Sequence, residues 1–127
     1  MPILYDNWWY NSVEHAYQAA KTLDPKERDR IREALSPGLA KQAGRKVTLR
    51  PGWLGMRVEV MDDLLRQKFS KEPLRGWLIG TDPQELVEGN TWGDEFWGVN
   101  LRTGQGKNHL GRLLMAIREG LEKEKVN

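Results

Sequence analysis

Apolar residues recur every three or four positions along most of the chain, and this spacing predicts a mainly helical protein. The first helical segment follows Ser12, a good N-cap residue. Four apolar residues share one face of this segment: Val13, Ala16, Tyr17 and Ala20. The pattern predicts an amphipathic helix that packs its apolar face against a core.

Start signals predict two further helices. In the stretch DPKERDRIREAL, Asp24 is the expected cap, Pro25 takes the first helical position and Glu27 completes a capping box. In the stretch SPGLAKQAGR, a Ser-Pro pair opens a short helix in the same way. This helix is expected to end at Gly44.

Two adjacent apolar rows run between Trp53 and Phe69, each with a spacing of four. A stripe this wide is typical of a buried helix, so the segment is the expected central helix. One or two helical turns are expected over residues 73–78. The last amphipathic helix has five apolar residues on one face: Leu110, Leu113, Leu114, Ile117 and Leu121. Its charged end, residues 122–127, is expected to be frayed.

Residues 81–108 are rich in Gly, Asn, Asp and Trp, which predicts a loop with one or two short strands. The strands are expected around Leu86 to Glu88 and Phe96 to Val99. The predicted fold class is therefore mainly α, a compact multihelical domain with one or two short strands within residues 84–100. Since the chain has no internal repeat and no low-complexity linker, a single domain over residues 1–127 is expected.

Composition excludes several classes of protein. Without cysteine, the chain has no thiol nucleophile, thiolate metal site or disulfide. Its 20 basic and 18 acidic residues alternate along the helices, which indicates a solvated surface rather than a nucleic-acid footprint. No metal is indicated, because His15 and His109 lie far apart without acidic spacing. The chain also lacks a long apolar run and a secretion signal, so a cytoplasmic location is expected.

The irregular stretch concentrates six side chains suited to chemistry: Glu88, Asn90, Trp92, Asp94, Glu95 and Trp97. Carboxylates and indoles together suit a pocket that stacks a flat ring and handles a proton or a positive charge. The alternative is that the indoles pin the loop to the core while the acids face water. The next stretch, GQGKNHLG, lacks the spacing of a phosphate-binding loop but leaves an anion site at a helix start open.

Three polar residues of the first helix, Glu14, Gln18 and Lys21, are separated by four and then three positions. They therefore share one stripe about a quarter-turn from the apolar face. A routine surface ladder explains the stripe, since an acid near the N-terminus and a lysine toward the C-terminus suit the helix dipole. The alternative is that these groups carry chemistry, and spacing leaves both interpretations open.

Five stretches together resemble the NADAR family, also called YbiA-like proteins. They are VEHAYQAAK, SPGLAKQAGR, the Trp53 region followed by VMDDLLRQKF, LVEGNTWGDEFWG, and GKNHLGRLLMAIRE. The match runs from about Trp9 to Leu121, in the family's order and rough spacing. The resemblance implies a mainly helical fold and cleavage of an N-glycosidic bond between a ribose and a base. It also implies a substrate class, since some members hydrolyse phosphorylated riboflavin intermediates and others remove ADP-ribose from guanine, including guanine in DNA.

The resemblance also implies roles for matched residues. Glu14, Glu88 and Asp94 are the candidate catalytic acids, because ribosyl transfer passes through an oxocarbenium-like state that a carboxylate stabilises. Lys21 is the fourth catalytic candidate, since its amine could trap the opened ribose as a Schiff base. Both mechanisms stay open. The candidate substrate-binding residues are Trp53, Trp92, Trp97, Asn90, Gly98, Asn108, Gly106 and Arg45.

The chain departs from the family upstream of its first helix. Members usually carry an additional segment with an aromatic-Asn-Phe motif, whereas only MPILYDNWWYN precedes the helix here. A shortened N-terminus is expected to open the site and alter substrate preference. The leading hypothesis is a cofactor-free N-glycosidase acting on a small ribosyl phosphate or an ADP-ribosylated base, free or in DNA. The rival hypothesis is a catalytically inactive module that binds ADP-ribose or NAD.

Overall fold

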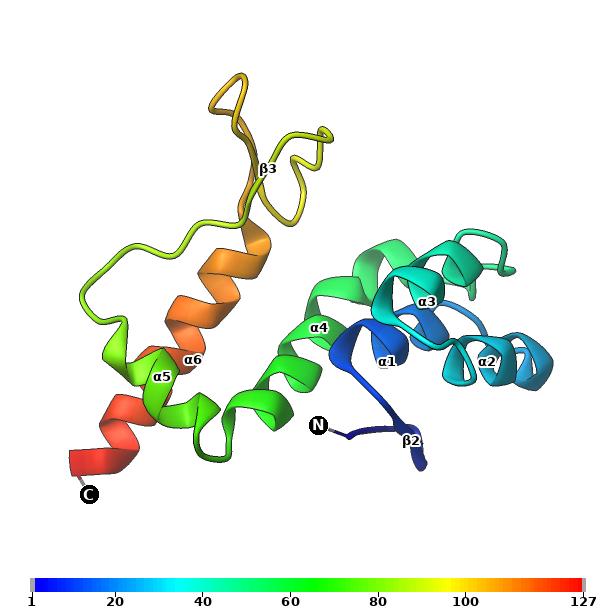
Figure 1. Ribbon diagram of the computed structural model, residues 1–127, viewed down its shortest axis with the longest axis horizontal. Coiled ribbons are helices and arrows are strands. Elements are labelled where there is room, and N and C mark those ends of the chain that lie inside the picture. The colour runs from blue at the N-terminus through cyan, green and yellow to red at the C-terminus, as the bar shows by residue number, and fades with distance from the viewer. Residues whose placement is uncertain (1, 127) are drawn as a thin grey trace. The chain divides into compact units, whose positions relative to one another are not determined.

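The computed structural model describes residues 2–126 and confirms the mainly helical fold. Six helices and two two-stranded sheets form its described part. In chain order the elements are β1 (Ile3–Tyr5), β2 (Trp8–Tyr10), α1 (Val13–Ala20), α2 (Pro25–Arg32), α3 (Pro37–Gly44), α4 (Trp53–Phe69), α5 (Leu74–Gly80), β3 (Gly89–Asn90), β4 (Val99–Asn100) and α6 (His109–Val126) (Figure 1). The chain divides into two compact units, Met1–Lys68 and Phe69–Asn127.

The predicted helix starts of unit 1 are confirmed. The Ser12 hydroxyl accepts a hydrogen bond from the backbone N–H of His15 at 3.1 Å, and α1 begins directly after it. The Ser36 hydroxyl accepts in the same way from Leu39 N–H at 3.1 Å, and α3 ends at Gly44 as expected. Side-chain caps of this kind satisfy backbone donors that the first helical turn leaves unpaired.

The predicted capping box of α2 is wrong in one part. Asp24 caps the helix by accepting from Lys26 N–H at 2.9 Å. Glu27, however, accepts from the Thr22 hydroxyl at 2.6 Å and from the Thr48 N–H at 3.1 Å. The segment after α3 brings an unpaired N–H to this carboxylate, so Glu27 serves a tertiary contact rather than the helix end.

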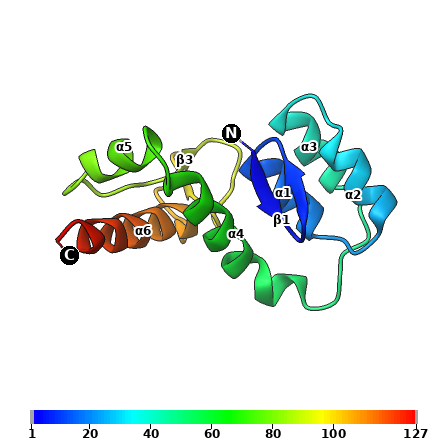
Figure 2. The same cartoon turned by 90° about the horizontal axis from the view of Figure 1, so that it is seen from below.

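A β-hairpin of β1 and β2 precedes α1 and was not predicted. The two strands are antiparallel, with Ile3 opposite Tyr10, and both of these side chains are buried. The turn between them uses Asp6 and Asn7 at positive φ, which suits the twist of a tight hairpin. In unit 1 the hairpin lies against α1, which also packs on α2 and α3 (Figure 2).

Helix α4 matches the predicted central helix in its bounds and in its wide buried stripe. Its buried residues are Trp53, Val60, Met61, Leu64 and Leu65. Near its end, the Gln67 amide pairs with both backbone groups of Leu4 in β1: Leu4 N–H donates to Oε1 at 2.9 Å and Nε2 donates to Leu4 O at 2.6 Å. This side chain occupies the edge of the hairpin that would otherwise be exposed.

In unit 2, α5 packs on α6, and residues 81–108 form the long connection between them. Short strands within residues 84–100 are confirmed, but both lie further along the chain than expected, as the parallel pair β3 and β4. The Asn108 side chain explains the shift, because it binds Leu86 O at 2.9 Å and Glu88 N–H at 2.9 Å. The backbone around residues 86–88 is therefore held by a side chain rather than by a strand.

Helix α6 continues to Val126. The frayed tail expected at residues 122–127 stays a prediction, and Asn127 lies outside the described residues. No helix within residues 2–126 has the length and apolar character that crossing a membrane requires.

Candidate active site

The polar stripe of α1 is not a surface ladder. Gln18 is 3% exposed, and Glu14 and Lys21 are half-buried. Gln18 Nε2 donates to Glu14 Oε1 at 2.8 Å, so the amide holds the carboxylate one turn away. A solvated ladder would leave all these groups in water, so the structure disfavours that interpretation, and a chemical role for them stays a prediction.

Burial lowers the pKa of the Lys21 ammonium below its ordinary value. The Glu14 carboxylate opposes this shift, whereas the positive charges of Lys41, Arg45 and Arg57 lower the pKa further. Desolvation and like charges both disfavour a protonated amine. Lys21 therefore supplies more neutral amine near neutral pH than a surface lysine does, and neutral amine is the nucleophilic form.

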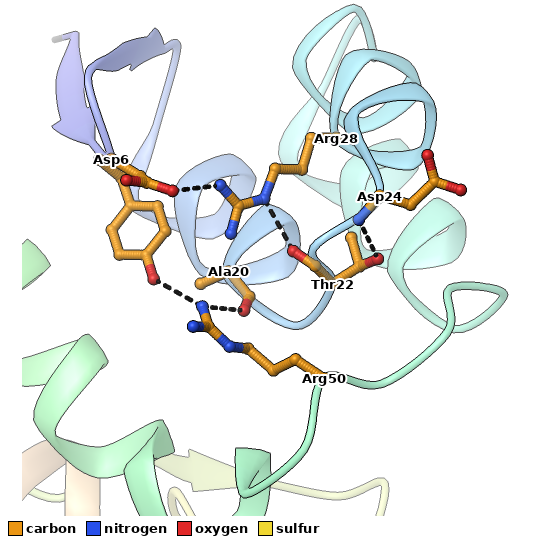
Figure 3. A network of polar contacts seen from close by, with 7 residues as sticks. Asp6, Ala20, Thr22, Asp24, Arg28 and Arg50 are labelled. Carbon is orange, nitrogen blue, oxygen red and sulfur yellow. Dashed lines mark hydrogen bonds and ion pairs between the residues drawn. The ribbon is translucent and has the colours of Figure 1, made fainter.

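Two arginines fix the backbone around Lys21. Arg50 N–H donates to Lys21 O at 2.7 Å, and Arg50 Nη1 donates to Ala20 O at 3.4 Å (Figure 3). Arg28 Nε donates to Thr22 O at 2.7 Å (Figure 3). Three successive carbonyls around the end of α1 are thus paired, two of them with arginine side chains, whose positive charge is favourable at a helix C-terminus.

Sequence reasoning missed both arginines. Arg28 is 8% exposed, and its Nη1 also forms an ion pair with Asp6 of the hairpin turn at 2.6 Å (Figure 3). Its position in the charged stretch DPKERDRIREAL gave no signal, because an arginine there is normally solvated. Its partner lies 22 positions away, so the contact follows only from the tertiary fold.

The substrate-binding candidates of unit 1 differ in accessibility. Trp53 is 4% exposed, and its ring lies 5.3 Å from that of Tyr17. The Lys21 amine lies 5.7 Å from the centre of the same Tyr17 ring. Trp53 therefore packs on the Tyr17 ring that the Lys21 amine approaches. Arg45, at the end of α3, is exposed. A substrate contact for either residue stays a prediction.

In unit 2, Asn90 and Asp94 build a tight turn. Asn90 is 2% exposed, accepts from Asp94 N–H at 2.9 Å and donates to Asp94 O at 2.8 Å. Asp94 Oδ1 in turn accepts from the N–H groups of Phe96 at 3.0 Å and Trp97 at 2.9 Å. One carboxylate oxygen of Asp94 therefore stabilises the turn by accepting these two backbone N–H groups.

An anion site at the start of α6 stays a prediction, but the structure disfavours it. Lys107, Asn108, His109 and Leu110 would supply its N–H groups, and all four already donate to carbonyls of residues 95–98. Such a site needs free N–H groups. The glycines around it fit tightly, since a Cβ at Gly106 would lie 2.2 Å from Gly98 O.

The two loop indoles behave differently. Trp97 is half-buried and packs edge-on against Phe96, with ring centres 4.9 Å apart. Trp92 is 69% exposed beside Gly93, which has a positive φ of 85°. Glu88 is exposed as well. Trp97 therefore packs within the loop, while the exposed ring of Trp92 suits stacking on a flat ligand.

Substitution of Asp94 separates its structural task from its charge. Asp94→Ala removes the acceptor of two backbone N–H groups and is expected to cost about 2 kcal/mol of folding free energy. Asp94→Asn keeps an oxygen at this position and is expected to lose less than about 1 kcal/mol. Urea unfolding of both variants tests this. Equal losses in the two variants would contradict the structural task.

A hollow of about 380 Å³ opens elsewhere in unit 1. Its walls are formed by Glu27, Arg30, Leu39, Gln42, Ala43, Lys46 and Val47. None of the predicted site residues lines it. A hollow of this size is typical of ligand sites, whereas the lysine with the lowered pKa and its acidic neighbour belong to the stripe of α1.

Comparison with known proteins finds relatives over nearly the whole chain. The NADAR domain model matches residues 1–122. The chain is 42% identical over 127 residues to N-glycosidase YbiA of Escherichia coli (strain K12), covering 98% of this chain and 78% of that one. It is 38% identical to riboflavin biosynthesis protein VVA0006 of Vibrio vulnificus (strain YJ016), covering 87% of this chain but 30% of that protein.

The fold is also found in a solved structure. The NMR structure of the E. coli protein YbiA matches with a TM-score of 0.87 and 41% identity, over all of this chain and 76% of that one. The relatives confirm the expected enzyme class, a hydrolase that cleaves N-glycosidic bonds. With a family model that spans nearly its whole length, the chain belongs to the NADAR family.

Proposed function

We propose that this chain hydrolyses the bond between ribose C1′ and the nitrogen of a base in a phosphorylated ribosyl compound. The substrate class is a phosphorylated intermediate of riboflavin biosynthesis or ADP-ribosylated guanine, free or in DNA. The observation that carries the proposal is the half-buried Lys21 amine, with its lowered pKa, beside Glu14 on one stripe of α1. An amine of this kind is suited to covalent attack on a sugar carbon.

The proposed reaction uses the amine as a transient partner of the sugar. The neutral Lys21 amine attacks C1′, the C1′–N bond breaks, and the base leaves with a proton. The ring then opens to an imine between Lys21 and C1′, and water adds to it. Release of the sugar restores the amine, so the net reaction consumes one water and yields free base and ribosyl product.

Glu14 has two tasks in this scheme. Its carboxylate, half-buried beside the amine, stabilises positive charge that develops at C1′ as the base departs. It also takes the proton that the amine loses on attack and passes it to the departing base. A direct attack of water on C1′ with Glu14 as base is the second mechanism, and it needs no covalent link to Lys21.

The surroundings of Lys21 favour a phosphorylated substrate. Lys41, Arg45 and Arg57 lie close enough to Lys21 to lower its pKa by their charge. No ion pair within residues 2–126 engages Lys41 or Arg45. Basic side chains that are not neutralised by acids are suited to phosphate oxygens. The negative charge of a bound phosphate would also offset the repulsion between these positive side chains.

Further assignments rest on the family resemblance. Glu88 and Asp94 as additional catalytic acids are proposed on that basis, as is substrate binding by Trp53, Trp92, Trp97, Asn90, Gly98, Gly106, Asn108 and Arg45. A single functional domain is supported by one family match over residues 1–122. The name of the Vibrio relative supports a riboflavin-pathway substrate. A cytoplasmic location is also proposed, since a chain without cysteine suits a reducing compartment.

Release of free base tests the proposed function. Purified protein is incubated with ADP-ribosylated guanine, as a nucleotide and in DNA, and separately with a phosphorylated riboflavin-pathway intermediate. Chromatography is expected to show free base from one of these substrates. Glu14→Gln is expected to reduce its release by about 100- to 10,000-fold, because the variant keeps the shape but loses the charge.

The matched control is Glu33→Gln, an exposed acid at the end of α2. It should leave turnover unchanged. Absence of turnover on every substrate, together with measurable binding of ADP-ribose, would contradict the enzyme and favour the inactive binding module. Equal loss of turnover and helicity in Glu14→Gln would show that Glu14 acts in folding only.

A further inference from the structure

We infer that Gln18 is the positioning residue of the site: its buried amide holds the Glu14 carboxylate in the orientation that serves Lys21. This inference rests on the proposed function and assigns a task to a side chain that touches neither the sugar nor the base. It predicts that the amide sets the rate of turnover.

The contact itself is direct and shielded from water. Gln18 Nε2 donates to Glu14 Oε1 at 2.8 Å, and Gln18 is 3% exposed. Hydrogen bonds to an ionised acceptor are stronger than those between neutral groups. Because water has little access to this amide, the carboxylate oxygen cannot readily exchange it for a solvent partner.

The other end of the amide is pressed against α3. A Cβ built at Gly44 would lie 2.0 Å from Gln18 Oε1 and 2.7 Å from its Cδ. Only glycine leaves room for the amide here, so α3 fixes it in place. Gln18 Oε1 has no hydrogen-bond partner in the described structure, although it is buried.

This orphaned oxygen argues against a purely structural glutamine. A buried acceptor without a partner is unfavourable, and an apolar side chain of similar length would fill the same space without that penalty. The one benefit of an amide at this position is the N–H group offered to Glu14. If the amide were reversed, its oxygen would face the carboxylate oxygen, so the observed orientation is the one that holds Glu14.

Gln18→Met tests the inference. Methionine keeps the length and volume but cannot donate, so kcat is expected to fall about 10- to 100-fold, the value of a hydrogen bond to a charged group. KM is expected to change little, since the amide touches neither the sugar nor the base. The thermal unfolding midpoint should stay equal or rise, because the orphaned oxygen is gone.

Gln42→Met is the matched control, an exposed glutamine of α3 outside this contact. It should change neither kcat nor KM. A Gln18→Met enzyme with wild-type kcat would overturn the inference. A loss of kcat that only accompanies a lower unfolding midpoint would also overturn it, since this result indicates packing alone.

A second measurement does not depend on turnover. In ¹H–¹⁵N spectra, the side-chain NH₂ protons of Gln18 are expected to exchange with water more slowly in the wild type than in Glu14→Ala, because only the wild type supplies the acceptor. The NH₂ protons of Gln42 should exchange equally fast in both proteins. Equal exchange of the Gln18 protons in the two proteins would refute the contact. If the wild-type protein releases no base, the proposed function fails, while the spectra still decide the role of Gln18.

Discussion

Lys21→Met is expected to abolish turnover, with a loss of at least about 1,000-fold in kcat, because no other group replaces the nucleophilic amine. The measurement is release of free base by wild-type and variant enzyme under identical conditions. Reduction with borohydride during turnover adds a structural readout. It should fix the ribosyl group to Lys21 in the wild type and leave Lys21→Met unlabelled by mass spectrometry.

Lys26→Met is the matched control, since Lys26 is an exposed lysine of α2 that faces water. It should keep wild-type turnover and the wild-type adduct. Full activity of Lys21→Met would remove the amine from the mechanism. Loss of activity in Lys21→Met without any adduct in the wild type would instead favour direct attack by water with Glu14 as base.

The lowered pKa of Lys21 sets the direction of two pH effects. Turnover should rise with pH until the amine is deprotonated, at a pH below the ordinary value of 10.5. Arg45→Met should move this limb to higher pH, because the Arg45 charge lowers the pKa of Lys21. Removing the Glu14 charge should move the pKa of Lys21 the opposite way, since Glu14 raises it.

Stability follows the same pKa with a definite sign. Between the folded pKa of Lys21 and its ordinary value of 10.5, the unfolded chain binds more protons than the folded one. The free energy of unfolding therefore rises with pH across this window. Below the window the buried charge opposes folding, so Lys21→Met should raise the unfolding midpoint at neutral pH. This is the stability cost expected of a functional residue.

The helices were predictable because their signals are local. Ser12, Asp24 and Ser36 each cap the helix that follows within a few residues, and the apolar stripe of α4 needs no knowledge of its partners. The strands of unit 2 were misplaced because Asn108 pairs with residues 86 and 88, about twenty positions upstream. A side chain so distant along the sequence gives no local pattern.

The candidate site also contains residues that the sequence could predict and residues that only the tertiary fold brings together. The stripe of Glu14, Gln18 and Lys21 could be found from helical spacing, but spacing could not say whether it faced water. Burial decides that question, and burial depends on α3 approaching at Gly44. Arg28 and Arg50 were not predicted at all, because each contacts the end of α1 through the tertiary fold.

The second large effect is expected in unit 2, where Gly98→Ala should cost at least about 3 kcal/mol of folding free energy. The added Cβ would lie 2.1 Å from Glu88 O and 2.9 Å from Asn90 Nδ2. Glu88 O accepts from Val99 N–H at 2.8 Å, so its displacement breaks the pairing of β3 with β4. Urea unfolding measures the loss, and hydrogen exchange should show lost protection at Val99.

Gly120→Ala is the control, because a Cβ at Gly120 in α6 meets nothing within 4 Å. Alanine favours a helix, so this variant should gain up to about 1 kcal/mol. A Gly98→Ala protein with wild-type stability and protected Val99 would contradict the prediction, because it would mean that the loop accommodates the added methyl group. Loss of base release in Gly98→Ala but not in Gly120→Ala would show that turnover requires the ordered loop, to which Glu88 and Asp94 belong. Unchanged release would confine the chemistry to the stripe of α1.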